Sequence, residues 1–168
     1  MNGEQQFKEK SFVEDVGLVF EQLSLPRMAG RILGCLMLSN PPHQSIEELA
    51  EALMASKGSI STMTRLLIQF GILERVSLPG VRHDYFRIRP DALQHLIEQR
   101  AGQITALRKL AERGLELVGD KSPVVRQGFE EMRDMYAFFE REFPALLERW
   151  EQEWEKRQAQ FVKEGGSK

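Results

Sequence analysis

Residues 45–89 constrain the fold most, because they encode two short helices and a hairpin in close succession. Ser45 and Glu48 have the spacing of a capping box, which predicts that a helix starts here. Apolar residues then recur at helical spacing as far as Leu53, and a second start signal follows at residues 56–59 (SKGS). Two short amphipathic helices separated by so few residues predict a helix-turn-helix.

The second of these helices, predicted over residues 57–70, has two faces of different chemistry. One face is expected to pack inward, and it carries Ile60, Met63, Thr64 and Leu67. The other face carries hydroxyl, amide and cationic groups. Hydroxyls and backbone amides at a helix N-terminus suit phosphate oxygens, while Arg and Gln can reach base edges in a major groove. An ordinary solvated face has the same composition, so this helix alone does not decide between the two interpretations.

A β-hairpin is predicted after the second helix, with strands over residues 72–77 and 83–89. Pro79-Gly80 suits the centre of a type II turn, because glycine tolerates the positive φ required there. Residues 56–89 contain six Lys or Arg and two acidic residues, a net charge of +4 in a chain whose net charge is −2. This local excess of positive charge favours a nucleic-acid partner.

Three sequence blocks carry a family resemblance: P-R-x-A-G-R-I-x-G at residues 26–34, S-K-G-S-x-S at 56–61 and P-G-x-R at 79–82. Over residues 12–89 the chain resembles the GbsR branch of the MarR-like winged helix-turn-helix transcriptional regulators. The resemblance implies a dimer that pairs through its terminal helices and binds DNA. The helices after residue 89 contain no motif that is diagnostic of the family.

We expect the second helix and the wing to contact double-stranded DNA. Arg65 is the best candidate for a base contact, and Arg82 is expected to enter or flank a minor groove. Two recognition helices related by a dyad read an inverted-repeat operator, with half-sites about one helical turn apart. The complete set of DNA-binding candidates is Lys57, Ser59, Ser61, Thr62, Arg65 and Arg82.

The predicted fold is mainly α with a small β-hairpin wing, and it is organised in three parts. Residues 1–24 form a helix that supports the core or the dimer, residues 25–90 the winged helix-turn-helix domain, and residues 91–168 a long-helix dimerisation region with a frayed C-terminal tail. The longest helix, predicted from Pro123 to about Phe161 with a kink near Pro144, carries a heptad stripe of apolar and aromatic residues. Monomers rarely leave such a stripe in water, so we expect a homodimer.

A helix predicted from Pro26 to Leu38 contains Gly30 and Gly34, one turn apart on one face. Glycine costs about 1 kcal/mol in a helix interior, so the pair predicts close approach of another backbone. Arg27 and Arg31 share another side of this helix, where they either meet phosphate or form salt bridges. Core candidates in the same helix are Ile32, Leu33, Leu36 and Met37.

No pattern typical of catalysis or metal binding is present in the sequence. His43, His83 and His95 lack metal-ligand spacing, and the single cysteine, Cys35, is expected to be a small core residue. No phosphate-binding glycine loop or nucleophile elbow occurs. We therefore expect no catalytic residues, no metal and no cofactor. No apolar run of about 18 residues and no signal-peptide core are present, which favours a cytoplasmic protein without membrane contact.

A small-molecule effector is also expected, since regulators of the resembled branch include choline-responsive repressors. Aromatic side chains hold quaternary ammonium groups by cation–π attraction, and Glu140 or Glu153 can add charge. The effector-binding candidates are Tyr136, Phe139 and Trp150, although the same aromatics also suit a dimer core.

The predicted function is therefore a sequence-specific dimeric repressor that a small molecule releases from DNA. Two alternatives stay open: a winged-helix module that binds protein, and a ligand-binding dimer without DNA affinity. The operator, the regulated genes, the sign of regulation, the effector and the helices that dominate the dimer interface are not determined by the sequence.

Overall fold

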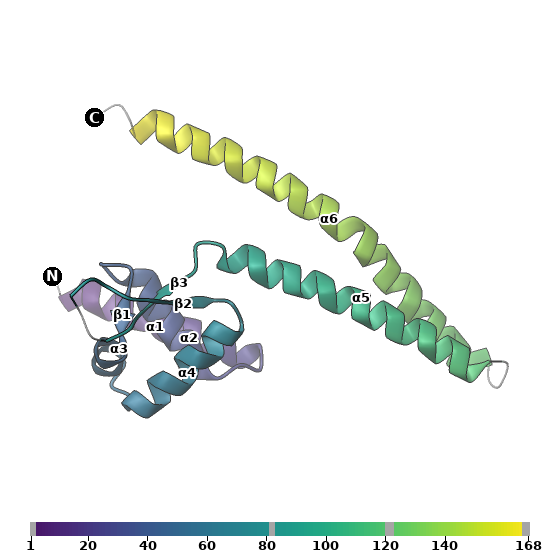
Figure 1. Ribbon diagram of the computed structural model, residues 1–168, viewed down its shortest axis with the longest axis horizontal. Helices are drawn as coiled ribbons and strands as arrows, with labels where there is room; N and C mark the ends of the chain where they lie inside the picture. The colour runs from purple at the N-terminus through teal and green to yellow at the C-terminus, as the bar shows by residue number, and fades with distance from the viewer. Residues whose placement is uncertain (1–2, 81–82, 120–122, 166–168) are drawn as a thin grey trace. The chain divides into compact units, whose positions relative to one another are not determined.

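The computed structural model describes residues 3–80, 83–119 and 123–165, with side chains up to residue 160. The elements are α1 (Gly3–Gln22), α2 (Arg27–Leu38), β1 (Gln44–Ser45), α3 (Ile46–Ala52), α4 (Lys57–Gln69), β2 (Leu73–Val76), β3 (Tyr85–Ile88), α5 (Ala92–Val118) and α6 (Pro123–Gly165) (Figure 1). The prediction of a mainly helical fold with a small wing is confirmed. The chain forms two compact units, Met1–Leu96 and Ile97–Lys168. The predicted boundaries after residues 24 and 90 stay a prediction.

The two helices of the helix-turn-helix start where the capping residues predict. The Ser45 hydroxyl accepts the backbone N–H of Glu48 at 3.2 Å, and the Glu48 carboxylate accepts the N–H of Ser45 at 2.7 Å. At the start of α4, the Ser56 hydroxyl accepts the N–H of Ser59 at 3.2 Å. These bonds satisfy amide groups that have no partner inside the helix, so they fix the first residue of each helix.

The core of the first unit holds α4 by its inner face. Ile60 and Leu67 are fully buried, as predicted, and so is Thr64, whose hydroxyl donates to the carbonyl of Ile60 at 3.0 Å. Met63 is only partly buried and packs against this core. The prediction that Met37 belongs to the core is wrong, since 56% of it is exposed. It lies about 100° around α2 from the buried Leu36, and therefore on another face.

A three-stranded antiparallel sheet closes the first unit, with strand order β1-β3-β2. β2 and β3 lie within the predicted hairpin strands and pair Leu73 with Ile88. The sequence did not predict β1, because two residues are too short for a strand periodicity. β1 pairs Ser45 with Tyr85, so the residue that caps α3 is also joined to the wing.

α1 packs closely on α2 at the two glycines. A Cβ added to Gly30 would lie 2.6 Å from the carbonyl oxygen of Val16, and one added to Gly34 would lie 3.1 Å from the Cα of Val13. The predicted close approach of another backbone is confirmed, and that backbone is α1. At this interface, adding a single Cβ atom to α2 would turn close contact with α1 into steric overlap.

Arg27 and Arg31 of α2 form salt bridges with α1. Their guanidinium groups lie 2.9 and 2.7 Å from the two carboxylate oxygens of Glu14. Arg31 also donates to the backbone carbonyl of Leu53 at 3.1 Å, at the C-cap of α3. Of the two predicted roles, these arginines take the salt-bridged one, and Arg31 links α1 to the turn of the helix-turn-helix.

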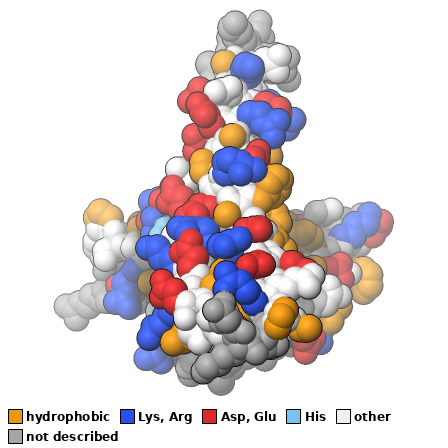
Figure 2. Space-filling view, turned by 90° about the vertical axis from the view of Figure 1, so that its right-hand side faces the viewer, with side chains coloured by type: hydrophobic (Ala, Val, Ile, Leu, Met, Phe, Trp, Pro, Cys, Tyr) orange, Lys and Arg blue, Asp and Glu red, His pale blue; other side chains and the backbone are white. Residues whose placement is uncertain are grey.

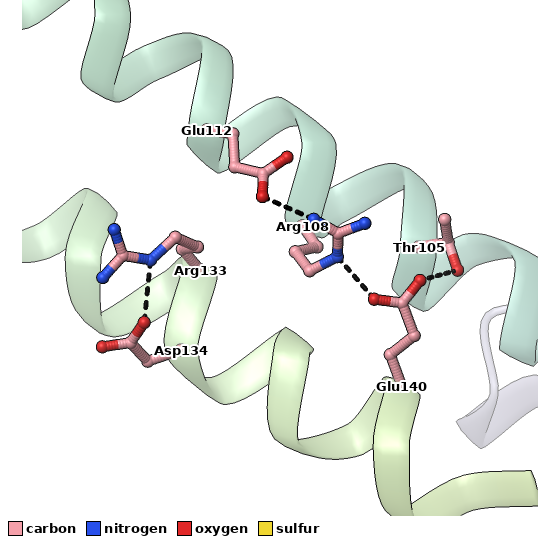
Figure 3. A network of polar contacts seen from close by, with 6 residues as sticks. All are labelled: Thr105, Arg108, Glu112, Arg133, Asp134 and Glu140. Atoms are coloured by element: carbon pink, nitrogen blue, oxygen red, sulfur yellow. Dashed lines mark hydrogen bonds and ion pairs between the residues drawn. The ribbon is translucent and has the colours of Figure 1, made fainter.

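In the second unit, a network of polar contacts joins α5 to α6 (Figure 3). Thr105 and Arg108 of α5 both donate to the carboxylate of Glu140 on α6, and Arg108 also binds Glu112. Hydrogen bonds from Thr105 and Arg108 hold the pKa of Glu140 below its ordinary value. Among the described residues of this unit, Ala111 is the one buried hydrophobic side chain. One chain therefore gives this unit almost no core.

α6 runs as one helix through Pro144 to Gly165, a few residues beyond its predicted end, and it curves along its length (Figure 1). The predicted frayed tail lies partly in this helix and partly in residues 166–168, outside the described residues. Over the described residues, every helix is too short or too polar to span a bilayer.

We predict that Gly30→Ala destabilises the first unit, because the new Cβ overlaps the backbone of Val16 and pushes α1 from α2. Overpacking of this kind costs about 1–3 kcal/mol. Gly58→Ala is the control, since a Cβ there meets nothing within 4 Å. Urea denaturation followed by circular dichroism measures both variants. Equal stabilities of Gly30→Ala and Gly58→Ala would contradict the glycine contact.

Candidate nucleic-acid interface

The outer face of α4 is the candidate interface of the first unit. Lys57, Thr62 and Arg65 are exposed, whereas Ser59 and Ser61 are partly buried. The buried inner face sets this orientation, because α4 cannot rotate without exposing Ile60 and Leu67. Five of the six sequence-predicted DNA contacts thus come from one helix. The sixth, Arg82, lies outside the described residues, although Gly80, two residues before it, has the positive φ of +80° that was expected for the wing turn.

Two of these side chains also bond to the backbone of α4. The Thr62 hydroxyl donates to the carbonyl of Gly58 at 2.9 Å, and the Nε of Arg65 donates to the carbonyl of Ser61 at 3.1 Å. The Arg65 bond fixes the base of the guanidinium but leaves both terminal amino groups, which are the donors suited to guanine O6 and N7. Arg65 is therefore both oriented and able to donate outward.

Most of the positive charge predicted for this region is paired with acids. Lys57 binds Glu47 at 2.8 Å, Arg75 binds Asp84 at 3.2 Å, Arg89 binds Asp91 at 2.6 Å, and Arg87 binds Glu74. Glu47 and Asp91 lie outside residues 56–89, so the sequence count of +4 omitted them. The net positive charge of the interface is therefore smaller than predicted. Figure 2, which faces the end where α5 meets α6, shows Lys and Arg side chains interspersed with Asp and Glu side chains there as well.

Arg65 differs from these cations, because it forms no ion pair with any described residue. Its guanidinium is exposed on the outer face of α4. A cation without an acidic neighbour carries no intramolecular competitor for a DNA acceptor. Arg65 is therefore the strongest candidate for a DNA contact on this face.

A groove of about 510 Å³ lies between the first turn of α4 and the residues of the wing loop that directly precede β3. Glu47, Lys57, Ser61, His83 and Asp84 are among its lining residues. The ring of His83 hydrogen-bonds to the Tyr85 hydroxyl at 3.1 Å, and this contact holds the wing residue in place. The groove thus brings α3, α4 and the wing to one surface.

The predicted effector residues lie on α6 of the second unit, far apart along the helix. Tyr136 and Trp150 are separated by about 21 Å at 1.5 Å per residue, so one chain does not place them around one ligand. Trp150 instead stacks on Trp154 with ring centroids 5.8 Å apart. Glu140, a predicted source of charge for the effector, is already bonded to Thr105 and Arg108.

The described residues contain no group of three or more His, Cys, Asp or Glu side chains that could hold a metal ion. Cys35 packs against the core of the first unit, as predicted, and burial raises the pKa of its thiol.

Comparison with known proteins agrees with this geometry. A family model described as MmpR5-like MarR family transcriptional regulator matches residues 91–153. The HTH-type transcriptional regulator MmpR5 of Mycobacterium tuberculosis is 45% identical over 141 residues, which cover 84% of this chain and 86% of that protein. The chain belongs to the MmpR5-like MarR family of transcriptional regulators.

Two further relatives support the placement of this MarR family regulator. The HTH-type transcriptional repressor OpcR of Bacillus subtilis is 30% identical over 97 residues, which cover 58% of this chain and 52% of that protein. A crystal structure of a transcriptional regulator has a TM-score of 0.74 and 44% identity, covering 86% of this chain and 99% of that one. The family consists of transcriptional regulators, not enzymes, and this member is a DNA-binding regulator.

The family model matches α5 and α6 as far as residue 153, the part in which the sequence showed no diagnostic motif. The residue blocks of the resemblance lie instead in the first unit.

Exchanging Arg65 and Lys57 separately for Ala should distinguish base reading from phosphate contact. Arg65→Ala should cost roughly 1–3 kcal/mol on the cognate site and relax specificity, because a base contact is lost. Lys57→Ala should weaken binding to all sequences alike and flatten the salt slope by up to about one unit. Fluorescence anisotropy with cognate and random duplexes measures both effects. An unchanged ratio of specific to random affinity in Arg65→Ala would exclude base reading by Arg65.

Proposed function

We propose that this regulator is a homodimeric repressor that binds an inverted-repeat operator through α4 and is released by a small molecule. The observation that carries the DNA contact is Arg65, an exposed cation on α4 without an acidic partner among the described residues. A repressing role is supported by the relative OpcR, which is described as a repressor. The narrower GbsR-branch placement and a cytoplasmic location are part of the same proposal.

The proposed contacts divide by position along α4. Lys57, Ser59 and Ser61 lie in its first turns, where backbone amides and the helix dipole favour phosphate. Thr62 and Arg65 lie further along, where exposed side chains reach base edges. Arg82 is proposed to contact the minor groove on the basis of its place in the wing sequence.

Dimerisation is supported by what each unit leaves exposed. Trp150 and Trp154 are 42% and 46% exposed in one chain, and other large apolar side chains of α6 are similarly exposed. Since the second unit has little core of its own, a second copy of the chain is the natural source of burial. In the first unit, Phe7 of α1 and Leu23, which follows this helix, are also exposed.

An effector site that uses Tyr136, Phe139 and Trp150 requires aromatics from two subunits, because α6 separates them within one chain. In the dimer, helices from two copies can bring such residues together. A quaternary ammonium ligand such as choline is the chemical class that these aromatics suit. The alternative is that these aromatic side chains form the core of the dimer interface.

Selection from a pool of random duplexes tests the DNA-binding function. We expect enrichment of an inverted repeat whose half-site centres lie about 10–11 base pairs apart, because each subunit places one α4 in a major groove. Arg65→Ala should enrich a less defined sequence under the same conditions. No enrichment by the wild-type protein would favour a protein-interaction module or a ligand-binding dimer.

The dimer is tested by exchanging an exposed aromatic residue. Trp150→Glu should raise the monomer fraction in analytical ultracentrifugation, because it places a charge in the proposed interface. Gln152→Glu is the matched control: it adds the same charge two residues along α6, on another face of the helix. A Trp150→Glu protein that remains as dimeric as this control would exclude Trp150 from the interface.

A further inference from the structure

The first residue of α4 is held by a carboxylate from the preceding helix. Oε1 of Glu47, in the first turn of α3, lies 2.8 Å from Nζ of Lys57. The two side chains are 55% and 65% exposed, and both line the groove beside the wing. The cation proposed to contact a phosphate is thus already paired in the free protein.

The Glu47 carboxylate is held by α3 itself as well as by Lys57. The hydrogen bond from Lys57 lowers the pKa of Glu47 most, and a bond to its own backbone amide lowers this pKa further. The N-terminus of α3 also favours a negative side chain. When the flexible Lys57 side chain moves to another acceptor, the carboxylate therefore stays charged.

Phosphate and Glu47 compete for the same ammonium group. If Lys57 binds a DNA phosphate, Glu47 loses its partner while a second negative charge arrives beside it. The repulsion is partly relieved when a salt cation binds to Glu47, which offsets the counterion that Lys57 releases from DNA. The ion pair therefore lowers both the affinity and the salt dependence that Lys57 gives to DNA binding.

We propose that Glu47 is a further residue of the DNA interface, an intramolecular competitor that sets the strength of the Lys57–phosphate contact. This inference rests on the proposed function, because it requires that α4 binds DNA. This competition differs from a general repulsion between acidic side chains and DNA, because it acts only through Lys57. In the wild-type protein, the competition by Glu47 also reduces the change in salt slope that removal of Lys57 produces.

Glu47→Gln keeps the size of the side chain and removes its charge. We expect roughly two- to fivefold tighter binding to cognate and random duplexes alike, in line with the strength of an exposed ion pair. The slope of log affinity against log salt should steepen by up to about one unit. Anisotropy titrations from 50 to 200 mM salt measure both quantities, and thermal unfolding confirms the fold of the variant.

Glu51→Gln is the matched control, because it removes the same charge from the exposed side of α3 at a position without a salt bridge to a described residue. It should change affinity and slope less than Glu47→Gln does. In a Lys57→Met background, Glu47→Gln should lose its effect on the slope and most of its effect on affinity. Equal effects of Glu47→Gln and Glu51→Gln, or an effect that persists without Lys57, would overturn the competitor role.

Weaker DNA binding by Glu47→Gln would also overturn the proposal, because it would mean that Glu47 positions Lys57 for phosphate. Failure of the proposed function gives a different result. In that case the wild-type protein binds neither duplex at 50 mM salt, and the inference fails together with the function.

Discussion

Burial of the inner face of α4 is the constraint on which the interface depends. Ile60, Thr64 and Leu67 are almost completely buried, so the rotation of α4 about its axis is fixed by the core. Ser56 fixes the first residue of the same helix through its capping bond. Because the rotation and the first residue of α4 are both set, the outward direction of Arg65 follows from the packing of Ile60, Thr64 and Leu67. Recognition and stability therefore depend on opposite sides of one short helix.

Charge at this interface is a property of the folded arrangement more than of the sequence. The cations of residues 56–89 outnumber the acids, yet Glu47 and Asp91 come from just outside that range and pair with Lys57 and Arg89. Pairing weakens attraction to phosphates, which all DNA sequences share. Among the described cations of α4, Arg65 has no acidic partner. The pairing of the other cations therefore increases the relative contribution of base contacts to binding.

Local signals predicted the first unit well, because each acts within a few residues. The Ser45–Glu48 capping box correctly predicted the start of α3. The paired glycines of α2 correctly predicted a close contact with another helix. Features that join distant residues were missed: the short strand β1 and the Glu47–Lys57 pair. The wrong prediction for Met37 is a local one, since helical spacing places it on another face of α2 than Leu36. In the second unit, an apolar stripe indicated burial but not the partner, since the same pattern suits an intrachain or an intersubunit contact. The site residues on α4 lie where predicted, and their contact with DNA stays a prediction.

The most direct test of the account is the affinity of the full chain for the DNA upstream of its own gene and for a random duplex. Fluorescence anisotropy between 50 and 200 mM salt provides both affinities and their salt slopes. The account predicts tighter binding to the upstream duplex at every salt concentration, with a measurable salt slope on both. Negligible affinity for both duplexes at 50 mM salt would contradict it.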